Sequence, residues 1–253
     1  MIRALQLPDL ISQTLVDGTL NGYKAYAAER KQKQAELEVS SSFAWTRGNF
    51  IDSKVKVAID SVEDVSFVHD KAGYAWEYLQ FIYDREGHKA LLIFKNARAI
   101  THNFDGQPGS ADHENYLYKL ALINRPLKNA GQLVGESTDQ QLQLELNLDV
   151  PQLSGQDFVQ VSQNFDRFYI VTYEIDDATK MIKKIALTMP DAQTMTLIEV
   201  QDLTSFIATS PFQIDPSELD SIMSEAVPDS HYNDAGTFGY EIGTETQQQE
   251  DQG

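Results

Sequence analysis

The segment MPDAQTMTLIEVQ, residues 189–201, contains the residue types of a metal-dependent nuclease site. In such sites a Pro-Asp pair and a Glu-x-Lys triplet hold divalent ions that activate water for attack on a phosphodiester. Asp191 and Glu199 stand at the acidic positions, and Gln201 replaces the lysine. Along one strand, eight residues at ~3.3 Å each would separate the two carboxylates by ~26 Å. Because Asp after Pro is also ordinary turn chemistry, we predict a β-hairpin, with Asp191 and Glu199 as alternative catalytic residues only.

A second candidate is a polar loop that could ligate zinc or manganese. Its imidazoles and carboxylates fall within thirteen residues: His102, Asp105, Asp112, His113 and Glu114. The loop lacks the His-x-x-x-His spacing of zincins, since a leucine stands four residues after His113. The simpler interpretation is a surface loop in which Asp112 caps a helix that begins near His113. We therefore expect no metal and no cofactor, and keep His102, Asp105, Asp112 and His113 as alternative ligands.

Other catalytic patterns are missing from the sequence. It has no Gly-Lys-Ser/Thr phosphate loop, no Gly-x-Ser-x-Gly elbow and no cysteine. Trp45, Arg47, Trp76 and Tyr78 could stack on bases as in single-strand binders, but an acidic chain without a basic groove argues against that role. We interpret these four residues as core or partner-binding residues, so the leading interpretation is not an enzyme.

The formal charge narrows the classes of partner. The 253 residues carry a net charge of −18, which repels nucleic-acid phosphates and anionic membranes and attracts basic proteins. From residue 211 onward there are ten acidic residues and no Lys or Arg, whereas the preceding 210 residues hold 28 acidic and 20 basic ones. We expect a basic protein partner, no direct binding of nucleic acid and no membrane association. Without cysteine, an N-terminal secretory signal or a long apolar run, the chain is expected to be cytoplasmic.

The first third of the chain is predicted to be mainly helical. Residues 8–38 show helical spacing of apolar residues, with Pro8 at the start and Gly18 ending a short first helix before a second one. The basic cluster Arg30, Lys31 and Lys33 of the second helix is expected to be a solvated face. Residues 40–59 fit either a helix or a helix-strand junction.

From residue 76 onward, apolar and polar residues alternate with a period of two, which predicts strands. Residues 76–83 and 89–95 form a hairpin around the DREG turn, and the second strand is apolar on both faces and hence central. A helix follows from about 115 and stops before Pro126. Residues 142–148 read as a strand and 158–166 as a short helix. Three strands within residues 167–203 form an antiparallel meander, and a capped helix is predicted from Pro216.

These elements predict an α+β fold: an antiparallel sheet, mostly hairpins and meander, with helices packed on one face. The expected divisions are an N-terminal helical segment (1–38), an α+β core (39–210) and an acidic tail (211–253), mostly disordered beyond 228 because little apolar surface is left to bury.

Three segments resemble an uncharacterised family of proteins from Gram-positive bacteria and their phages. They are YDREGHKALLIFK, HENYLYKLALINRPL and DRFYIVTYEIDDATKMIKKIALTMPD, and the similar pieces lie within residues 45–200. The middle segment contains a Tyr-Leu-x-x-Leu-x-x-x-Asn helix, formed by Tyr116, Leu117, Leu120 and Asn124. The resemblance implies an accessory protein of a mobile element with an undefined role, and it carries no known catalytic residues over to this sequence.

The sequence thus favours a non-enzymatic, acidic interaction protein that binds a basic partner, for example a nucleic-acid-binding or defence protein of the host. A tail that serves solubility alone is the simpler form of this hypothesis. The alternative is a divergent metal-dependent nuclease whose acidic residues come from separate strands.

Overall fold

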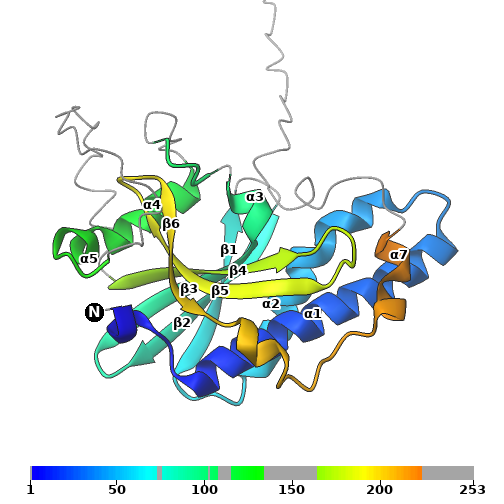
Figure 1. Ribbon diagram of the computed structural model, residues 1–253, viewed down its shortest axis with the longest axis horizontal. Coiled ribbons are helices and arrows are strands. Elements are labelled where there is room, and N and C mark those ends of the chain that lie inside the picture. The colour runs from blue at the N-terminus through cyan, green and yellow to red at the C-terminus, as the bar shows by residue number, and fades with distance from the viewer. Residues whose placement is uncertain (1, 73–75, 102, 108–114, 134–163, 224–253) are drawn as a thin grey trace, which may run out of the picture.

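The computed structural model describes residues 2–72, 76–101, 103–107, 115–133 and 164–223. Six strands form one twisted sheet in chain order (Figure 1). They are β1 (Val65–Ala72), β2 (Trp76–Arg85), β3 (His88–Asn96), β4 (Arg167–Ile175), β5 (Ile182–Asp191) and β6 (Thr196–Asp202). Neighbours pair antiparallel except β3 and β4, which run parallel. The sheet is therefore two three-stranded meanders joined side by side, and the α+β prediction is confirmed.

The predicted hairpins form around turns of the expected kind. Between β2 and β3, Glu86 and Gly87 both have positive φ angles (54° and 79°), which suits a tight hairpin turn. β3 is buried along most of its length, as expected of a central strand. The β5–β6 hairpin is also confirmed, but its turn lies after Asp191 rather than at the PDAQ segment, because β5 continues through Pro190 to the Asp191–Thr196 pair.

One long helix, α1 (Asp9–Glu36), replaces the two helices predicted for residues 8–38. No helix ends at Gly18. This residue lies inside α1, at the point where α2 (Arg47–Ile59) crosses it. A Cβ atom on Gly18 would lie 2.6 Å from Cα of Val55, and one on Gly22 would lie 2.4 Å from Cα of Ile51. The glycines thus serve close helix packing rather than helix termination, because only their missing side chains let the two backbones meet.

Residues 40–59, left open between helix and junction, form a 3-10 turn, η2 (Ser41–Thr46), followed by α2. The basic cluster on α1 is only partly the solvated face that was predicted. Lys31 is exposed and Lys33 pairs with Glu36, but Arg30 is 3% exposed and donates to the Ser40 carbonyl at 2.6 Å. The chain returning from α1 through η2 covers Arg30, which helical spacing alone could not reveal.

The main core lies between α1, α2 and one face of the sheet (Figure 1). Its sheet side includes Phe81, Leu92, Val171 and Leu187, all at most 1% exposed. Burial of this apolar face supplies the dominant stabilisation of the fold. Because α1 shares one core with the strands, the predicted N-terminal segment packs as part of the same unit as residues 39–210.

A smaller set of helices packs on the opposite face, which the prediction of helices on one face did not include. They lie in the crossover from β3 to β4: α3 (Ala97–Thr101), α4 (Tyr116–Ala121), η4 (Leu122–Asn124) and α5 (Arg125–Asn129). Leu117 and Ile123 bury against Leu91 and Ile170 of the sheet. The prediction that helical structure stops before Pro126 is wrong, because Pro126 occupies the first turn of α5, where its missing N–H has no intrahelical partner to lose.

The C-terminal part of the described chain returns to α1. After η5 (Thr204–Ile207), the predicted capped helix is present as η6 (Pro216–Leu219) and α7 (Asp220–Met223), with a capping box between Asp215 and Glu218. Figure 1 shows α7 beside α1. Ile214, Leu219 and Ile222 are buried in the main core. Residues 211–223, assigned to the acidic tail from composition, are therefore part of the packed fold.

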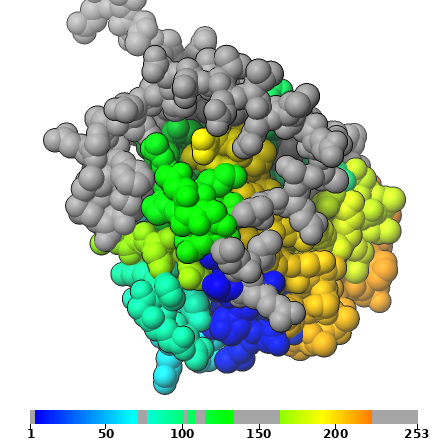
Figure 2. Space-filling view, turned by 60° about the vertical axis from the view of Figure 1, so that its left-hand side comes forward, coloured from blue at the N-terminus to red at the C-terminus, as the bar shows by residue number. Residues whose placement is uncertain are grey.

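The N-terminal turn η1 (Ile2–Leu5) lies against β6, and Figure 2 shows these first residues (blue) beside the chain around β6 (orange). The strand predicted at 142–148 and most of the helix predicted at 158–166 fall outside the described residues. Among the helices that are described, none combines the length and the apolar character needed to cross a bilayer.

Candidate functional site

The structure separates the three residues of the nuclease-like segment into three local roles. Asp191 is 3% exposed and closes the β5–β6 turn by accepting from the backbone N–H of Gln193 at 2.9 Å and the hydroxyl of Thr194 at 2.8 Å. Lys128 of α5 forms an ion pair with the same carboxylate, its ammonium 2.8 Å from Asp191 Oδ2. Burial alone would raise the pKa of Asp191, but the hydrogen bonds from Lys128, Gln193 and Thr194 outweigh it, and the pKa lies below its usual value.

Glu199 and Gln201 point to other partners. Glu199 forms an ion pair with Lys184 across the β5–β6 ladder at 2.7 Å. The Gln201 side chain accepts from the N–H of Leu7 at 2.9 Å and donates to the hydroxyl of Ser12 at 3.2 Å, which fastens the N-terminus to the sheet. Each side chain thus has a structural partner of its own, and within the described ranges no group of three or more His, Asp or Glu residues could hold a metal ion.

Of the predicted loop ligands, only Asp105 is described, and it accepts from the backbone N–H of Gln107 at 2.9 Å. His102, Asp112 and His113 lie outside the described residues.

The four aromatic and basic binding candidates do not form one surface row. Trp45 is half-buried in η2, and Arg47 is 1% exposed with its guanidinium 5.9 Å from the ring centre of Tyr26. Trp76 begins β2, and its side chain lies outside what the structure describes. Tyr78 is half-buried and donates from its hydroxyl to Asp70 at 3.0 Å.

Tyr78 also belongs to an aromatic cluster around Lys95. Its ring centre lies 5.3 Å from that of Tyr116, and the Lys95 ammonium is 5.5 Å from both ring centres. A cation held over two rings is stabilised by their quadrupoles. Burial raises the pKa of Tyr78 well above its usual range, so its hydroxyl stays protonated at neutral pH.

A half-buried carboxylate, that of Asp52, lies near this cluster, where β2 and β3 diverge. The two strands pair only from Phe81 to Arg85 of β2, and beyond that point the N–H of Leu79 donates to Asp52 of α2 at 2.9 Å. Burial raises the pKa of Asp52 to about 7, while the hydrogen bond from Leu79 and the charge of Lys95 act in the opposite direction. Asp52 thus accepts from the N–H of Leu79 at a point where β2 still pairs with β1 but no longer with β3.

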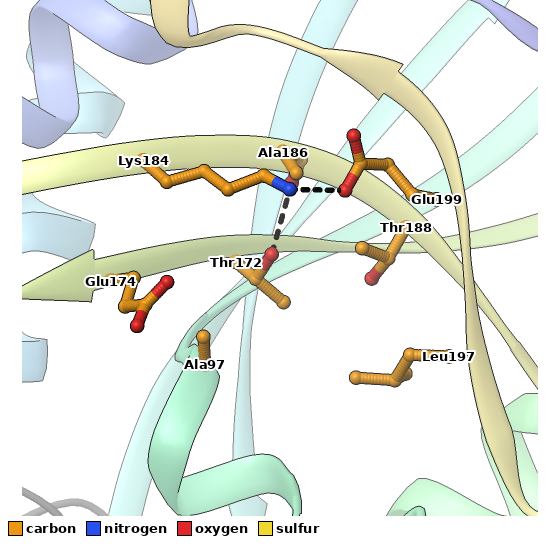
Figure 3. A pocket seen from close by; sticks show the side chains of 8 residues that line it. All are labelled: Ala97, Thr172, Glu174, Lys184, Ala186, Thr188, Leu197 and Glu199. Atoms are coloured by element: carbon orange, nitrogen blue, oxygen red, sulfur yellow. Dashed lines mark hydrogen bonds and ion pairs between the residues drawn. The ribbon is translucent and has the colours of Figure 1, made fainter. Parts of the chain in front are cut away.

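The sheet has a hollow on the face that carries α3 and α4, over strands β4, β5 and β6 (Figure 3). We call it the sheet hollow. It has a volume of about 200 Å³ and is lined by Ala97, Thr172, Glu174, Lys184, Ala186, Thr188, Leu197 and Glu199. Among the lining residues, Ala97 and Ala186 have small side chains, which leave space beside α3.

Two buried threonines give the hollow a polar floor. Thr172 is 6% exposed and Thr188 is 5% exposed. Thr188 donates its hydroxyl hydrogen to the Ile170 carbonyl at 2.8 Å, and Thr172 donates to the Ala186 carbonyl at 3.3 Å. Because a hydroxyl has one hydrogen and two lone pairs, both oxygens have acceptor capacity left.

Charged side chains border the hollow. Lys184 extends across it toward Glu199, with Glu174 on the other side (Figure 3). The hydrogen bond to Glu199 raises the pKa of Lys184 despite the opposing effect of burial, and the charges of Glu199, Asp202 and Glu174 add to the increase. The border is therefore an environment that stabilises a positive charge.

Sequence reasoning did not identify the hollow. Its signal was present in the alternation of β4 and β5, which places Thr172 and Glu174 on one face with Lys184 and Thr188. The pattern does not show that neighbouring helices leave this part of the face uncovered.

No protein family, curated protein or solved structure matches the chain.

Proposed function

We propose that the chain is a non-enzymatic interaction protein that binds a basic protein through its acidic C-terminal segment, residues 224–253. The distribution of charge carries this proposal. All 20 Lys and Arg residues lie in the described ranges together with 24 of the 38 acidic ones, and the other 14 acidic residues lie outside them. Seven of those 14 belong to residues 224–253, which contain no Lys or Arg.

The packed fold is close to charge balance, with 24 acidic and 20 basic side chains in the described ranges. At least eleven of the acidic side chains form ion pairs with Lys, Arg or His. Examples are Glu218 with Lys24 at 3.0 Å and Glu174 with Lys183 at 2.9 Å. Surface pairs of this kind add little stability, but they reduce the field of the folded body. The unpaired surplus of negative charge is thus concentrated in segments such as 224–253.

A concentrated surplus favours fast encounter with a basic protein more than tight packing against it. Electrostatic steering raises association rates and is lost as salt screens the charges, with a Debye length of about 8 Å at 0.15 M and about 3 Å at 1 M. We therefore expect residues 224–253 to act mainly by increasing the association rate with the partner. The context of a mobile element, implied by the family resemblance, belongs to the same proposal.

The test uses three baits in a pull-down from the native host: the full chain, a chain ending at Met223, and a full-length chain with the seven carboxylates of residues 224–253 changed to amides. The third bait is the matched control, since it keeps the length of the segment and removes its charge. We expect a protein of high isoelectric point bound by the full chain and lost from both others. Surface plasmon resonance should then show an association rate that falls steeply with salt. Equal capture by all three baits, or an association rate flat from low to high salt, would refute the proposal.

The nuclease alternative gains no support from Asp191 and Glu199, which are engaged with different lysines. Its test is a melting experiment with manganese, magnesium or zinc, because an ion that binds the native state must raise the melting temperature. An increase with any of them would revive the alternative.

A further inference from the structure

We propose that the sheet hollow receives an arginine side chain of the basic partner. The inference rests on the proposed function and adds to it a site on the folded body and the group that the site recognises. Its basis is the chemistry of the hollow: buried hydroxyl acceptors on the floor, carboxylates at the border, and space between them (Figure 3).

The floor selects a ligand with hydrogen-bond donors. Thr172 and Thr188 have committed their only hydroxyl hydrogens to the Ala186 and Ile170 carbonyls. Their oxygens can therefore only accept from a ligand. Both side chains are more than nine-tenths buried, so their positions are fixed by the sheet and need no ordering when a ligand binds.

The border selects a cation. Glu199 and Glu174 line the hollow on two sides. Glu199 pairs with the ammonium of Lys184 at 2.7 Å, and Glu174 pairs with that of Lys183 at 2.9 Å. Lys184 is 44% exposed at its side chain and Glu199 is 41% exposed, so this pair is open to exchange. A cation from a partner can replace Lys184 at Glu199, while the long lysine side chain swings out into water.

Guanidinium matches these acceptors better than ammonium. Arginine presents five N–H donors in one plane and no acceptor. A planar group can bond a carboxylate at the border and still direct N–H groups to the hydroxyls below it, whereas the three hydrogens of an ammonium radiate from a single nitrogen. Ala97 and Ala186 leave room for the flat group. Arginine is also enriched among the residues that dominate binding at protein interfaces.

The direct test is an NMR titration of the full chain, observing the methyl groups of Thr172, Thr188 and Leu197. The probes are methylguanidinium chloride and methylammonium chloride at constant ionic strength. We expect saturable shifts at these methyls with methylguanidinium, and an affinity at least about fivefold weaker for methylammonium. Absence of saturation, or equal affinity for the two cations, would overturn the inference.

Three variants sharpen the titration. Thr188→Val removes an acceptor at nearly constant volume and should weaken methylguanidinium binding about tenfold. Thr14→Val is the matched control, since the Thr14 hydroxyl also donates to a backbone carbonyl, at 2.8 Å, but on the exposed part of α1. Lys184→Met removes the competing cation at an exposed position and should strengthen binding several-fold. An affinity unchanged in both Thr188→Val and Lys184→Met would contradict the proposed site.

Measurements with the captured partner separate this inference from the proposed function. If the hollow binds arginine, Thr188→Val should raise the dissociation rate of the partner, whereas ending the chain at Met223 should lower the association rate. A partner that depends on residues 224–253 but dissociates at the same rate from Thr188→Val would refute the site and leave the proposed function intact. A partner bound without residues 224–253 would refute the proposed function.

Discussion

Replacing Asn124 with leucine is expected to lower the free energy of unfolding by about 3–6 kcal/mol. Asn124 is 1% exposed and lies where β4 and β5 separate, beyond their last pair, Ile170 with Thr188. Its amide accepts from the N–H of Phe168 at 2.9 Å and donates to the carbonyls of Phe168 at 2.9 Å and Pro190 at 3.0 Å. Pro190 has no N–H to give to Phe168, so the asparagine supplies the donor that the ladder lacks.

The expected loss in the free energy of unfolding follows from the backbone groups that lose the asparagine as their hydrogen-bond partner. Leucine has a similar size but leaves one N–H and two carbonyls without this partner, and each buried unsatisfied group costs about 1–3 kcal/mol. Burial of the added apolar surface offsets part of the total. For a chain of this size the loss corresponds to a decrease of about 6–24 °C in melting temperature.

The assay is urea unfolding followed by circular dichroism, together with a thermal scan. Asn49→Leu is the matched control, since Asn49 lies on the exposed side of α2 and its replacement should change stability by less than about 0.5 kcal/mol. A loss below about 1 kcal/mol for the Asn124 variant would show that water or a relaxed strand replaces the amide, and the reasoning would fail.

Three further predictions concern the packing and the termini. Gly22→Ala should destabilise the fold by about 1–3 kcal/mol despite the better helix propensity of alanine, whereas Gly48→Ala, with nothing within 4 Å of the added methyl, should not, as urea unfolding can show. Because the pKa of Asp52 is raised from 3.8 to about 7, its contribution to stability is complete below pH 4 and is lost as pH rises to 7. Asp52→Asn should flatten that part of the stability profile, and an unchanged slope between pH 5 and 7 would argue against the shift. A chain ending at Pro228 should melt within about 2 °C of the full chain, whereas one ending at Ser210 should lose roughly 1.5–3 kcal/mol for each buried apolar side chain removed with residues 211–223. Equal melting of the two truncated chains would contradict the packing of α7.

The sequence alone determined the features that depend on neighbouring residues. The alternation of apolar and polar residues determined β2, β3 and the late meander, because side chains on a strand must face opposite sides of the sheet. The DREG turn and the cap before Pro216 follow from residues that bond within a few positions of themselves. The two-residue error at the β5–β6 turn is of the same local kind, since Pro190 is tolerated within the strand.

Only the tertiary structure decided what depends on contacts between distant segments. Gly18 and Gly22 carry a local signal for breaking a helix, but their role is set by α2, which approaches from more than twenty residues away. Arg and Asn are residue types that usually lie at the surface. Arg30 and Asn124 are nevertheless buried, because other elements supply their hydrogen-bond partners. The sheet hollow exists because α3 and α4 cover one part of a sheet face and leave the next part open. Pairing and covering of this kind are set by the packing of the whole chain, and local periodicity does not encode them.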